Sequence, residues 1–196
     1  MPLSDRARRL VVPLAAFVFG LAVLAFALVL SLSPSQTGGT VGGPFALVDQ
    51  DGRTVTEKDV TGRPHLVFFG FTHCPDVCPT TLFQMSEVLK AVGEKGYNLR
   101  ALFITVDPER DRPEVLKAYL ASFDERITGL TGDPAAVDAA VKTYRAFARK
   151  VPTKEGDYTM EHTSYVYLMD RRNRFVSSVS LNRPADQVAG ELIKQL

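Results

Sequence analysis

The hydrophobic pattern divides the chain into one long apolar segment and a following region of shorter, periodic patterns. Residues 10–30, LVVPLAAFVFGLAVLAFALVL, are 21 residues without a charged or hydrogen-bonding side chain. As a helix rising about 1.5 Å per residue, the segment would span roughly 31 Å, close to the hydrocarbon thickness of a bilayer. The apolar region of a cleaved signal peptide, the alternative interpretation, is shorter, about 7–15 residues. The pattern therefore predicts a transmembrane anchor over residues 10–32.

The residues on either side of this segment predict its orientation. Arg6, Arg8 and Arg9 precede it and are opposed only by Asp5. Because positive charge is retained on the cytoplasmic side, residues 1–9 are expected to be a cytoplasmic stub. Residues 33–44, rich in Ser, Gly and Pro, have the composition of a flexible linker. We therefore expect a single-pass protein of the bacterial inner membrane, with residues 45–196 forming one domain in the periplasm.

Strand patterns recur through residues 45–196. Two nearly continuous apolar runs, 65–72 and 99–106, are typical of strands buried on both faces. Residues 45–56 alternate around Asp51-Gly52 and predict a β-hairpin. Residues 163–170 and 174–180 predict a second hairpin, and ITGL at 127–130 a further short strand.

Helical spacing separates these strands. Apolar residues recur every three or four positions after Pro79, after Pro113, from Asp133-Pro134 through Phe147, and after Pro184. The order is a hairpin, βαβα, an additional βα, then ββα. It predicts an α/β protein with a thioredoxin-like fold, enlarged by an N-terminal β-hairpin and a βα insertion and preceded by one transmembrane helix.

The overall composition excludes several classes of protein. The 23 basic and 22 acidic residues give a net charge of +1, and residues 37–196 carry 20 basic and 21 acidic residues, so no basic excess points to nucleic acid. A hydrophobic content of 45% is enough for a folded core. The two cysteines are too few for a scaffold of several disulfides.

The two cysteines lie at the carboxyl end of the first buried strand, where ligands gather in open α/β sheets. Cys74 and Cys78, in FTHCPDVCPTT, are four residues apart at the start of a helix, so both sulfurs can face one point. A helix N-terminus also favours thiolate over thiol. Two thiolates suit a soft cation, Cu(I) above all. An inert disulfide is the alternative interpretation.

Among the three histidines, the position of His162 indicates a ligand. It ends a polar loop immediately before a strand, where thioredoxins carry a proline that faces their cysteines. Together, Cys74, Cys78 and His162 would form a three-coordinate site for Cu(I) that also holds Cu(II) with one more ligand. Structural zinc normally takes four ligands and fits less well. His65 is better explained as a strand residue, and His73 by a side chain that diverges from Cys74.

The motifs FTHCPDVCPTT, TVDPERDRPEVLKAY and EHTSYVYLMD, in this order, resemble the Sco/SenC/PrrC family of membrane-anchored copper proteins over roughly residues 40–196. The resemblance implies a thioredoxin-like domain that binds one copper ion through Cys74, Cys78 and His162. It also implies a role in assembling the binuclear copper centre of cytochrome c oxidase subunit II, by copper donation, by reduction of that subunit's cysteines, or both. The family usually has Asp before the metal-binding His, whereas this chain has Glu161.

Several neighbouring residues have two interpretations each. Asp76 and Glu161 are candidates for tuning the copper site, although an acidic residue at a helix N-terminus also explains Asp76. Asp107, Arg110 and Asp111 suit either an orienting or partner-docking network or a turn that caps the next helix. Met160, two residues before His162, is a weaker candidate for an auxiliary ligand.

The chemistry of a cysteine pair leaves other functions open. A dedicated thiol-disulfide reductase would use Cys74 and Cys78 as its redox pair, so the sequence leaves open whether the protein is an enzyme. A copper or redox sensor would use the same site to signal. The peroxidatic pattern P-x-x-x-[ST]-x-x-C is absent, since Phe71 or Pro75 occupies the hydroxyl position. Outside the cytoplasm the cysteines tend toward disulfide, so copper binding predicts a thioredoxin-like reductant as a partner, with another copper chaperone as a possible donor.

Overall fold

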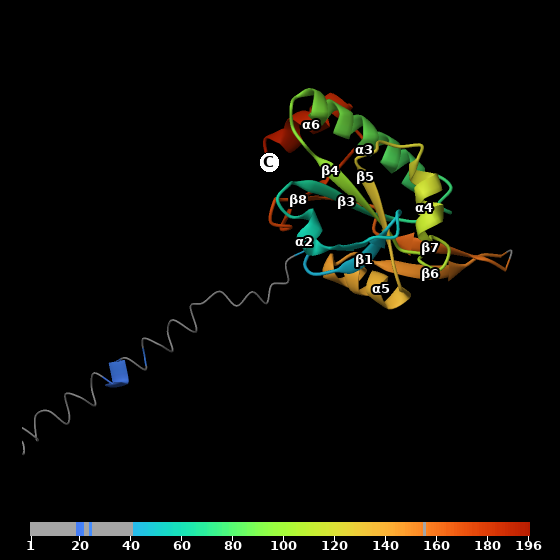
Figure 1. The fold of residues 1–196 in the computed structure, drawn as a ribbon, viewed down its shortest axis with the longest axis horizontal. Coiled ribbons are helices and arrows are strands. Elements are labelled where there is room, and N and C mark those ends of the chain that lie inside the picture. The colour runs from blue at the N-terminus through green and yellow to red at the C-terminus, as the bar shows by residue number, and fades with distance from the viewer. Residues whose placement is uncertain (1–18, 22–23, 25–40, 155) are drawn as a thin grey trace, which may run out of the picture. The chain divides into compact units, whose positions relative to one another are not determined.

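The computed structural model describes residues 19–21, 24, 41–154 and 156–196 (Figure 1). The predicted stub, most of the predicted anchor and residues 33–40 of the predicted linker lie outside these residues. In the part of the chain that is described, no helix combines the length and the apolar character needed to cross a bilayer. Residues Thr40–Leu196 form one compact unit.

A seven-stranded mixed sheet forms the centre of this unit, with the strand order β2-β1-β5-β4-β3-β8-β9. β3, β4 and β5 run parallel to one another, whereas β1, β8 and β9 pair antiparallel with their neighbours. The strands are β1 (Ala46–Asp49), β2 (Thr54–Thr56), β3 (His65–Gly70), β4 (Arg100–Thr105), β5 (Ile127–Thr131), β8 (Val166–Met169) and β9 (Phe175–Val179). This is the mixed sheet that the predicted order of elements requires.

Helices cover both faces of the sheet. The helices are α2 (Glu57–Val60), α3 (Val77–Glu94), α4 (Pro113–Leu120), α5 (Pro134–Thr143) and α6 (Ala185–Ile193). Figure 1 shows α3 and α6 side by side on one face and α5 on the other. All six residues of β3 are buried between the layers, as its continuous apolar run predicts.

Proline sets the start of three of these helices. Pro113 and Pro134 lie in the first turn of α4 and α5, where the missing N–H has no partner to lose. Pro184 is the residue immediately before α6. α3 begins at Val77, before the predicted Pro79, because a proline is tolerated within a first turn. α5 ends at Thr143, short of the predicted Phe147.

The main difference from the predicted elements is a second, two-stranded sheet. β6 (Ala148–Pro152) and β7 (Tyr158–His162) pair antiparallel where the sequence predicted a polar loop. Most residues of this hairpin are exposed or half-buried, so the chain lacks the apolar alternation by which strands are recognised. The sequence placed His162 in a loop immediately before a strand, whereas in the structure His162 is the last residue of β7.

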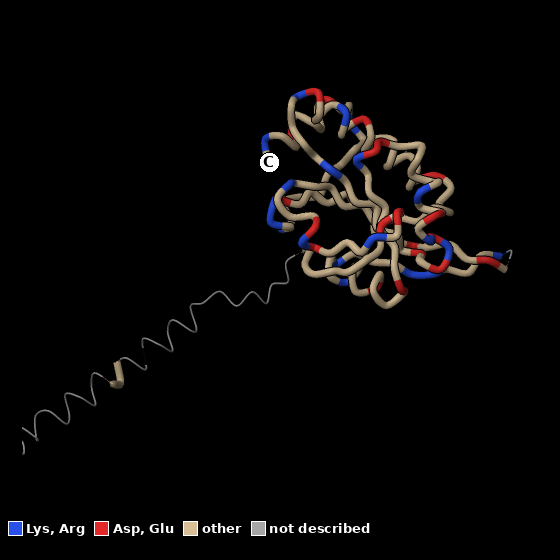
Figure 2. Tube along the Cα trace, viewed as in Figure 1, with Lys and Arg blue, Asp and Glu red and all other residues tan. Residues whose placement is uncertain are grey.

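Charge is dispersed over the described residues, with Lys and Arg interspersed among Asp and Glu (Figure 2). This distribution agrees with the balanced composition.

Candidate metal centre

The cysteine loop follows directly from the buried strand β3. The chain turns after Gly70, and the Cys74 backbone N–H donates to the Phe71 carbonyl at 3.3 Å. Cys78 lies in the first turn of α3, and its backbone N–H donates to the Cys74 sulfur at 3.4 Å. The four-residue spacing therefore places both sulfurs at the N-terminal end of α3, as predicted.

His162 reaches this point from the other sheet. Its Nδ1 lies 2.9 Å from the Thr163 carbonyl oxygen, which identifies Nδ1 as the protonated nitrogen. Its Nε2 lies 3.7 Å from the Cys78 sulfur. The ring packs edge-on against Phe71 and Phe68, at centroid distances of 5.7 and 6.3 Å. The imidazole is thus oriented with a free lone pair toward the cysteines.

The two sulfurs and an imidazole nitrogen of His162 all lie within 4.8 Å of one another. Both cysteines are free thiols, Cys78 fully buried and Cys74 half-buried. The structure therefore brings together the three residues that the sequence selected from distant segments, and their chemistry suits a metal ion that prefers sulfur and nitrogen.

Burial controls the protonation of the site in the absence of metal. It raises the pKa of the Cys78 thiol, against a smaller opposing effect of a backbone hydrogen bond at Phe71. It also lowers the pKa of His162. Burial therefore favours the thiol form of Cys78, whereas its place at a helix N-terminus favours the thiolate.

The other predicted residues have contacts of their own. His73 Nδ1 lies 3.1 Å from the Thr72 hydroxyl, and His65 lies buried at the start of β3 with Nδ1 3.3 Å from the Arg63 carbonyl. Asp76 is exposed at the N-cap of α3 and accepts from the Thr80 hydroxyl at 3.4 Å. These contacts give each residue a local structural role.

Two candidates flank His162 on β7. Glu161 is exposed and paired with Arg149 of β6 at 2.6 Å, on the opposite face of the strand from His162. Met160 packs against the edge of the hydrophobic core. The three-residue group of His, Cys and carboxylate side chains described above does not include Glu161.

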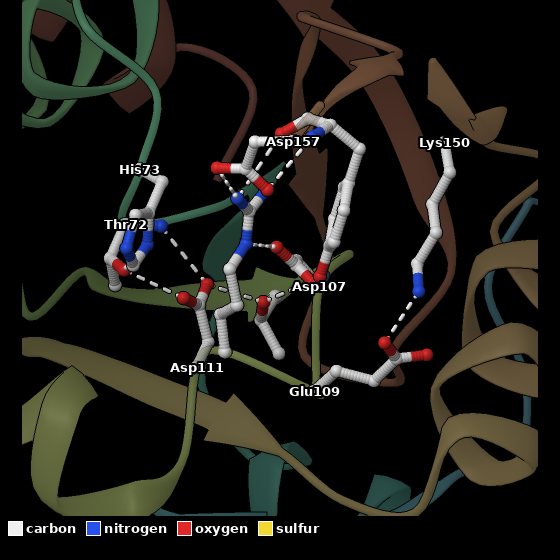
Figure 3. A network of polar contacts seen from close by, with 10 residues as sticks. Thr72, His73, Asp107, Glu109, Asp111, Lys150 and Asp157 are labelled. Atoms are coloured by element: carbon white, nitrogen blue, oxygen red, sulfur yellow. Dashed lines mark hydrogen bonds and ion pairs between the residues drawn. The ribbon is translucent and has the colours of Figure 1, made fainter. Parts of the chain in front are cut away.

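Sequence reasoning missed three residues that support the site. Gly70 ends β3 so close to Cys78 that an added Cβ would lie 3.0 Å from its sulfur. Thr72 and Tyr158 take part in a polar network with Asp107 and Asp111 (Figure 3). A glycine at the end of an apolar run was the available signal for Gly70, whereas nothing local distinguishes Thr72 and Tyr158 from other loop residues.

Comparison with known proteins places this site in a family. A family model described as SCO1/SenC matches residues 33–196. "Protein SCO1 homolog 1, mitochondrial" of Arabidopsis thaliana is 34% identical over 164 residues, which are 83% of this chain and 49% of that protein. The chain thus spans about half the length of this relative.

Solved structures agree with the family match. The copper-bound structure of Bradyrhizobium japonicum ScoI is 54% identical, with a TM-score of 0.75 over 80% of this chain and 99% of that chain. BsSco, described as a member of the Sco family of cytochrome c oxidase assembly proteins with a disulfide switch, is 27% identical, with a TM-score of 0.64 over 80% of this chain and 94% of that chain. These likenesses confirm the predicted thioredoxin-like fold of the domain. Because the family model matches residues 33–196, most of the chain, this chain belongs to the SCO1/SenC family.

Proposed function

We propose that the protein binds one copper ion through Cys74, Cys78 and His162 and supplies it to the binuclear copper centre of cytochrome c oxidase subunit II. The observation that carries the proposal is the convergence of these three side chains within 4.8 Å from a loop, a helix and a separate hairpin. The copper-bound Bradyrhizobium ScoI structure supports the choice of metal.

The distance between one sulfur and the imidazole nitrogen fits a trigonal site. With metal–sulfur and metal–nitrogen bonds of about 2.3 and about 2.0 Å, as for zinc, a trigonal geometry separates sulfur from nitrogen by about 3.7 Å. The Cys78 sulfur and His162 Nε2 lie 3.7 Å apart. Two soft sulfurs and one imidazole favour copper over harder cations.

Copper binding at this site is coupled to proton release. Burial keeps the Cys78 thiol protonated, so coordination must displace its proton. His162 is neutral and needs no deprotonation, because burial lowers the pKa of its imidazole. The site therefore retains copper more strongly as the pH rises, and a partner that offers thiolates of its own can take the ion by ligand exchange.

The cellular setting completes the proposal. Residues 10–32 are the expected single membrane anchor, and Arg6, Arg8 and Arg9 favour a domain on the periplasmic side. Tethering at the membrane that holds the oxidase raises the effective concentration of an otherwise weak encounter. A thioredoxin-like reductant would keep the cysteines reduced, and a second copper chaperone is the expected donor.

Titration with Cu(I) and Cu(II) under anaerobic conditions tests the ligand set. We expect one copper per chain in the wild-type protein and a loss of affinity of about tenfold or more in Cys74→Ser, Cys78→Ser and His162→Ala. His73→Ala is the matched control, because this imidazole adjoins Cys74 in sequence but contacts Thr72. Wild-type affinity and unchanged spectra in His162→Ala would contradict the proposed ligands.

A thiol-disulfide reductase is a second candidate, favoured by the unequal exposure of the cysteines. Half-buried Cys74 is the accessible attacking sulfur, and buried Cys78 is placed to resolve. Attack on a partner disulfide would form a mixed disulfide with Cys74. Cys78 would then displace the partner's thiol, leaving a Cys74–Cys78 disulfide and a partner reduced by two electrons.

The two candidates differ in their need for His162. A metal-free reductase retains its disulfide-exchange rate in His162→Ala, whereas copper delivery is lost in that variant. We expect the copper content of subunit II in cells to fall in His162→Ala. Normal oxidase assembly with this variant would favour the reductase.

A further inference from the structure

His162 lies on a hairpin that is not hydrogen-bonded to the central sheet, and only its ring reaches that sheet, by packing against Phe68 of β3. β7 pairs with β6 alone, in a two-stranded sheet separate from the seven strands that carry the cysteine loop. A two-stranded hairpin of this kind has marginal stability by itself. Contacts outside the hairpin must therefore set the distance between its imidazole and the sulfurs.

Tyr158, the first residue of β7, makes three of these contacts. Its hydroxyl donates to Asp107 Oδ1 at 2.9 Å. Burial raises the pKa of Tyr158 to about 12, so the hydroxyl keeps its proton for this bond. Its backbone carbonyl accepts from Arg110 Nη1 at 3.1 Å, and the Arg110 guanidinium carbon lies 3.8 Å above the centroid of its ring.

Arg110 connects the tyrosine to a fully buried carboxylate. Its Nε donates to Asp107 Oδ2, and its Nη1 lies 3.6 Å from Asp157, the residue before β7 (Figure 3). The side chain of Asp107 is 0% exposed and that of Arg110 is 18% exposed. The pair is thus largely withdrawn from water. A hydrogen bond between charged groups is strong and directional in such an environment.

The same loop also holds the cysteines. Buried Asp111, four residues after Asp107, accepts from the Thr72 backbone N–H at 3.0 Å and from the Thr72 hydroxyl at 2.6 Å. It accepts from Thr105 at 2.6 Å as well. The Asp111 backbone N–H donates to the Asp107 carbonyl at 2.9 Å, which makes the loop a tight turn.

We propose that Asp107, Arg110 and Tyr158 form a clamp that positions His162 relative to the two cysteines. Loop 107–111 contacts both the cysteine loop and β7, so it sets the position of one relative to the other. Asp111 fixes the cysteine loop through Thr72, and Asp107 with Arg110 fixes β7 through Tyr158. These are positioning residues, because none of them belongs to the three-residue ligand group. The role in copper binding rests on the function proposed above, whereas the mechanical link does not.

The orienting role follows from the direction of the contacts. A turn that served only to cap α4 would direct its polar groups to the backbone of that helix. Instead, the side chains of Asp107 and Arg110 reach β7, and the side chain of Asp111 reaches Thr72. The sequence left both interpretations of these residues open, and the geometry favours the orienting one.

The test compares Tyr158→Phe and Arg110→Gln with Arg183→Gln. Tyr158→Phe removes a single oxygen atom and keeps the ring, so it guards against a loss of folding. Arg183 pairs with Glu191 in an exposed ion pair and serves as the matched control. Hydrogen exchange of the backbone amides of 158–162 is measured without metal, and the nitrogen hyperfine coupling of Cu(II) with metal.

We expect exchange in 158–162 to accelerate about tenfold in Tyr158→Phe, the effect of losing one hydrogen bond to a charged group. Arg110→Gln should accelerate it at least as much, because Arg110 contacts Asp107 and Asp157 as well as Tyr158. Amides of β9 should be unaffected. The nitrogen coupling should weaken toward that of His162→Ala while copper still binds the two sulfurs. Arg110→Lys keeps the charge but lacks the forked donors, so it should not restore the wild-type signal.

The outcomes separate the clamp from the function. Unchanged exchange in Tyr158→Phe and Arg110→Gln would overturn the clamp, and so would faster exchange with an unchanged nitrogen coupling. Wild-type exchange and wild-type nitrogen coupling in Arg110→Lys would show that only the positive charge at this position matters. That result would also overturn the clamp. Failure of the proposed function has a different signature, the absence of nitrogen coupling from the wild-type protein itself.

Discussion

Replacing Gly70 by alanine tests the packing around the candidate site without removing a ligand. Gly70 ends β3, and an added Cβ would lie 2.6 Å from Cε2 of Phe103 and 3.0 Å from the Cys78 sulfur. Carbon atoms in packed interiors are normally about 3.5–4.0 Å apart. The phenyl ring must therefore move by about 1 Å, and the sulfur by several tenths of an ångström.

The magnitude follows from two opposing effects. Overpacking of a filled core costs about 1–3 kcal/mol, while replacing a strand glycine by alanine returns about 0.5–1 kcal/mol of backbone entropy. We expect the free energy of unfolding of Gly70→Ala to fall by about 1–2 kcal/mol. A metal site tolerates ligand displacements of about 0.2 Å, so copper affinity should fall about tenfold to a hundredfold.

The assay combines urea unfolding of the metal-free protein with competition for Cu(I) against a chromophoric chelator. Gly190→Ala in α6 is the control, because a Cβ there meets no atom within 4 Å. The control should keep its copper affinity and gain some stability from the better helix former. If Gly70→Ala matched wild type in both stability and copper affinity, the close contact between β3 and the Cys78 sulfur would be refuted.

Three further predictions concern the scaffold, each measured by urea unfolding. Arg126 hydrogen-bonds to Asp124 and lowers the pKa of this carboxyl, so the pair stabilises the fold above the unfolded pKa of about 3.9. Arg126→Gln should therefore cost about 1 kcal/mol at pH 7. The difference in the free energy of unfolding between wild type and Arg126→Gln should narrow as the pH falls through the lowered pKa of folded Asp124. A difference that does not change with pH would contradict the ion pair. Leu89→Ala, in the buried stripe of α3, should cost about 2–5 kcal/mol, and a loss under 1 kcal/mol would mean that α3 is poorly packed. Tyr144→Phe removes a buried hydroxyl that donates to Asn173 at 3.3 Å and should cost about 1 kcal/mol; no change would show that water replaces the bond.

The sequence predicted most of the central sheet and its helices because burial leaves a local signature. The apolar run 65–72 contains β3, and the periodic apolar positions after Pro79 belong to α3. It did not predict β6 and β7, whose residues are mostly polar and remain half-exposed. Asp157 and Tyr158 contact loop 107–111, and such contacts leave no periodic pattern in either segment.

The sequence by itself determined the chemistry of this protein: two cysteines four residues apart at a helix start, one histidine placed to face them, and the motifs that mark the family. The tertiary structure decided how these groups meet. It placed His162 Nε2 3.7 Å from the Cys78 sulfur, and it made Cys78 a buried thiol although its helical position alone favoured the thiolate. It also showed that Asp107, Arg110 and Asp111 reach across to Tyr158 and Thr72. Donor identity is a property of single residues, whereas distance and desolvation depend on segments that are far apart in the chain and are set only when the whole domain is packed.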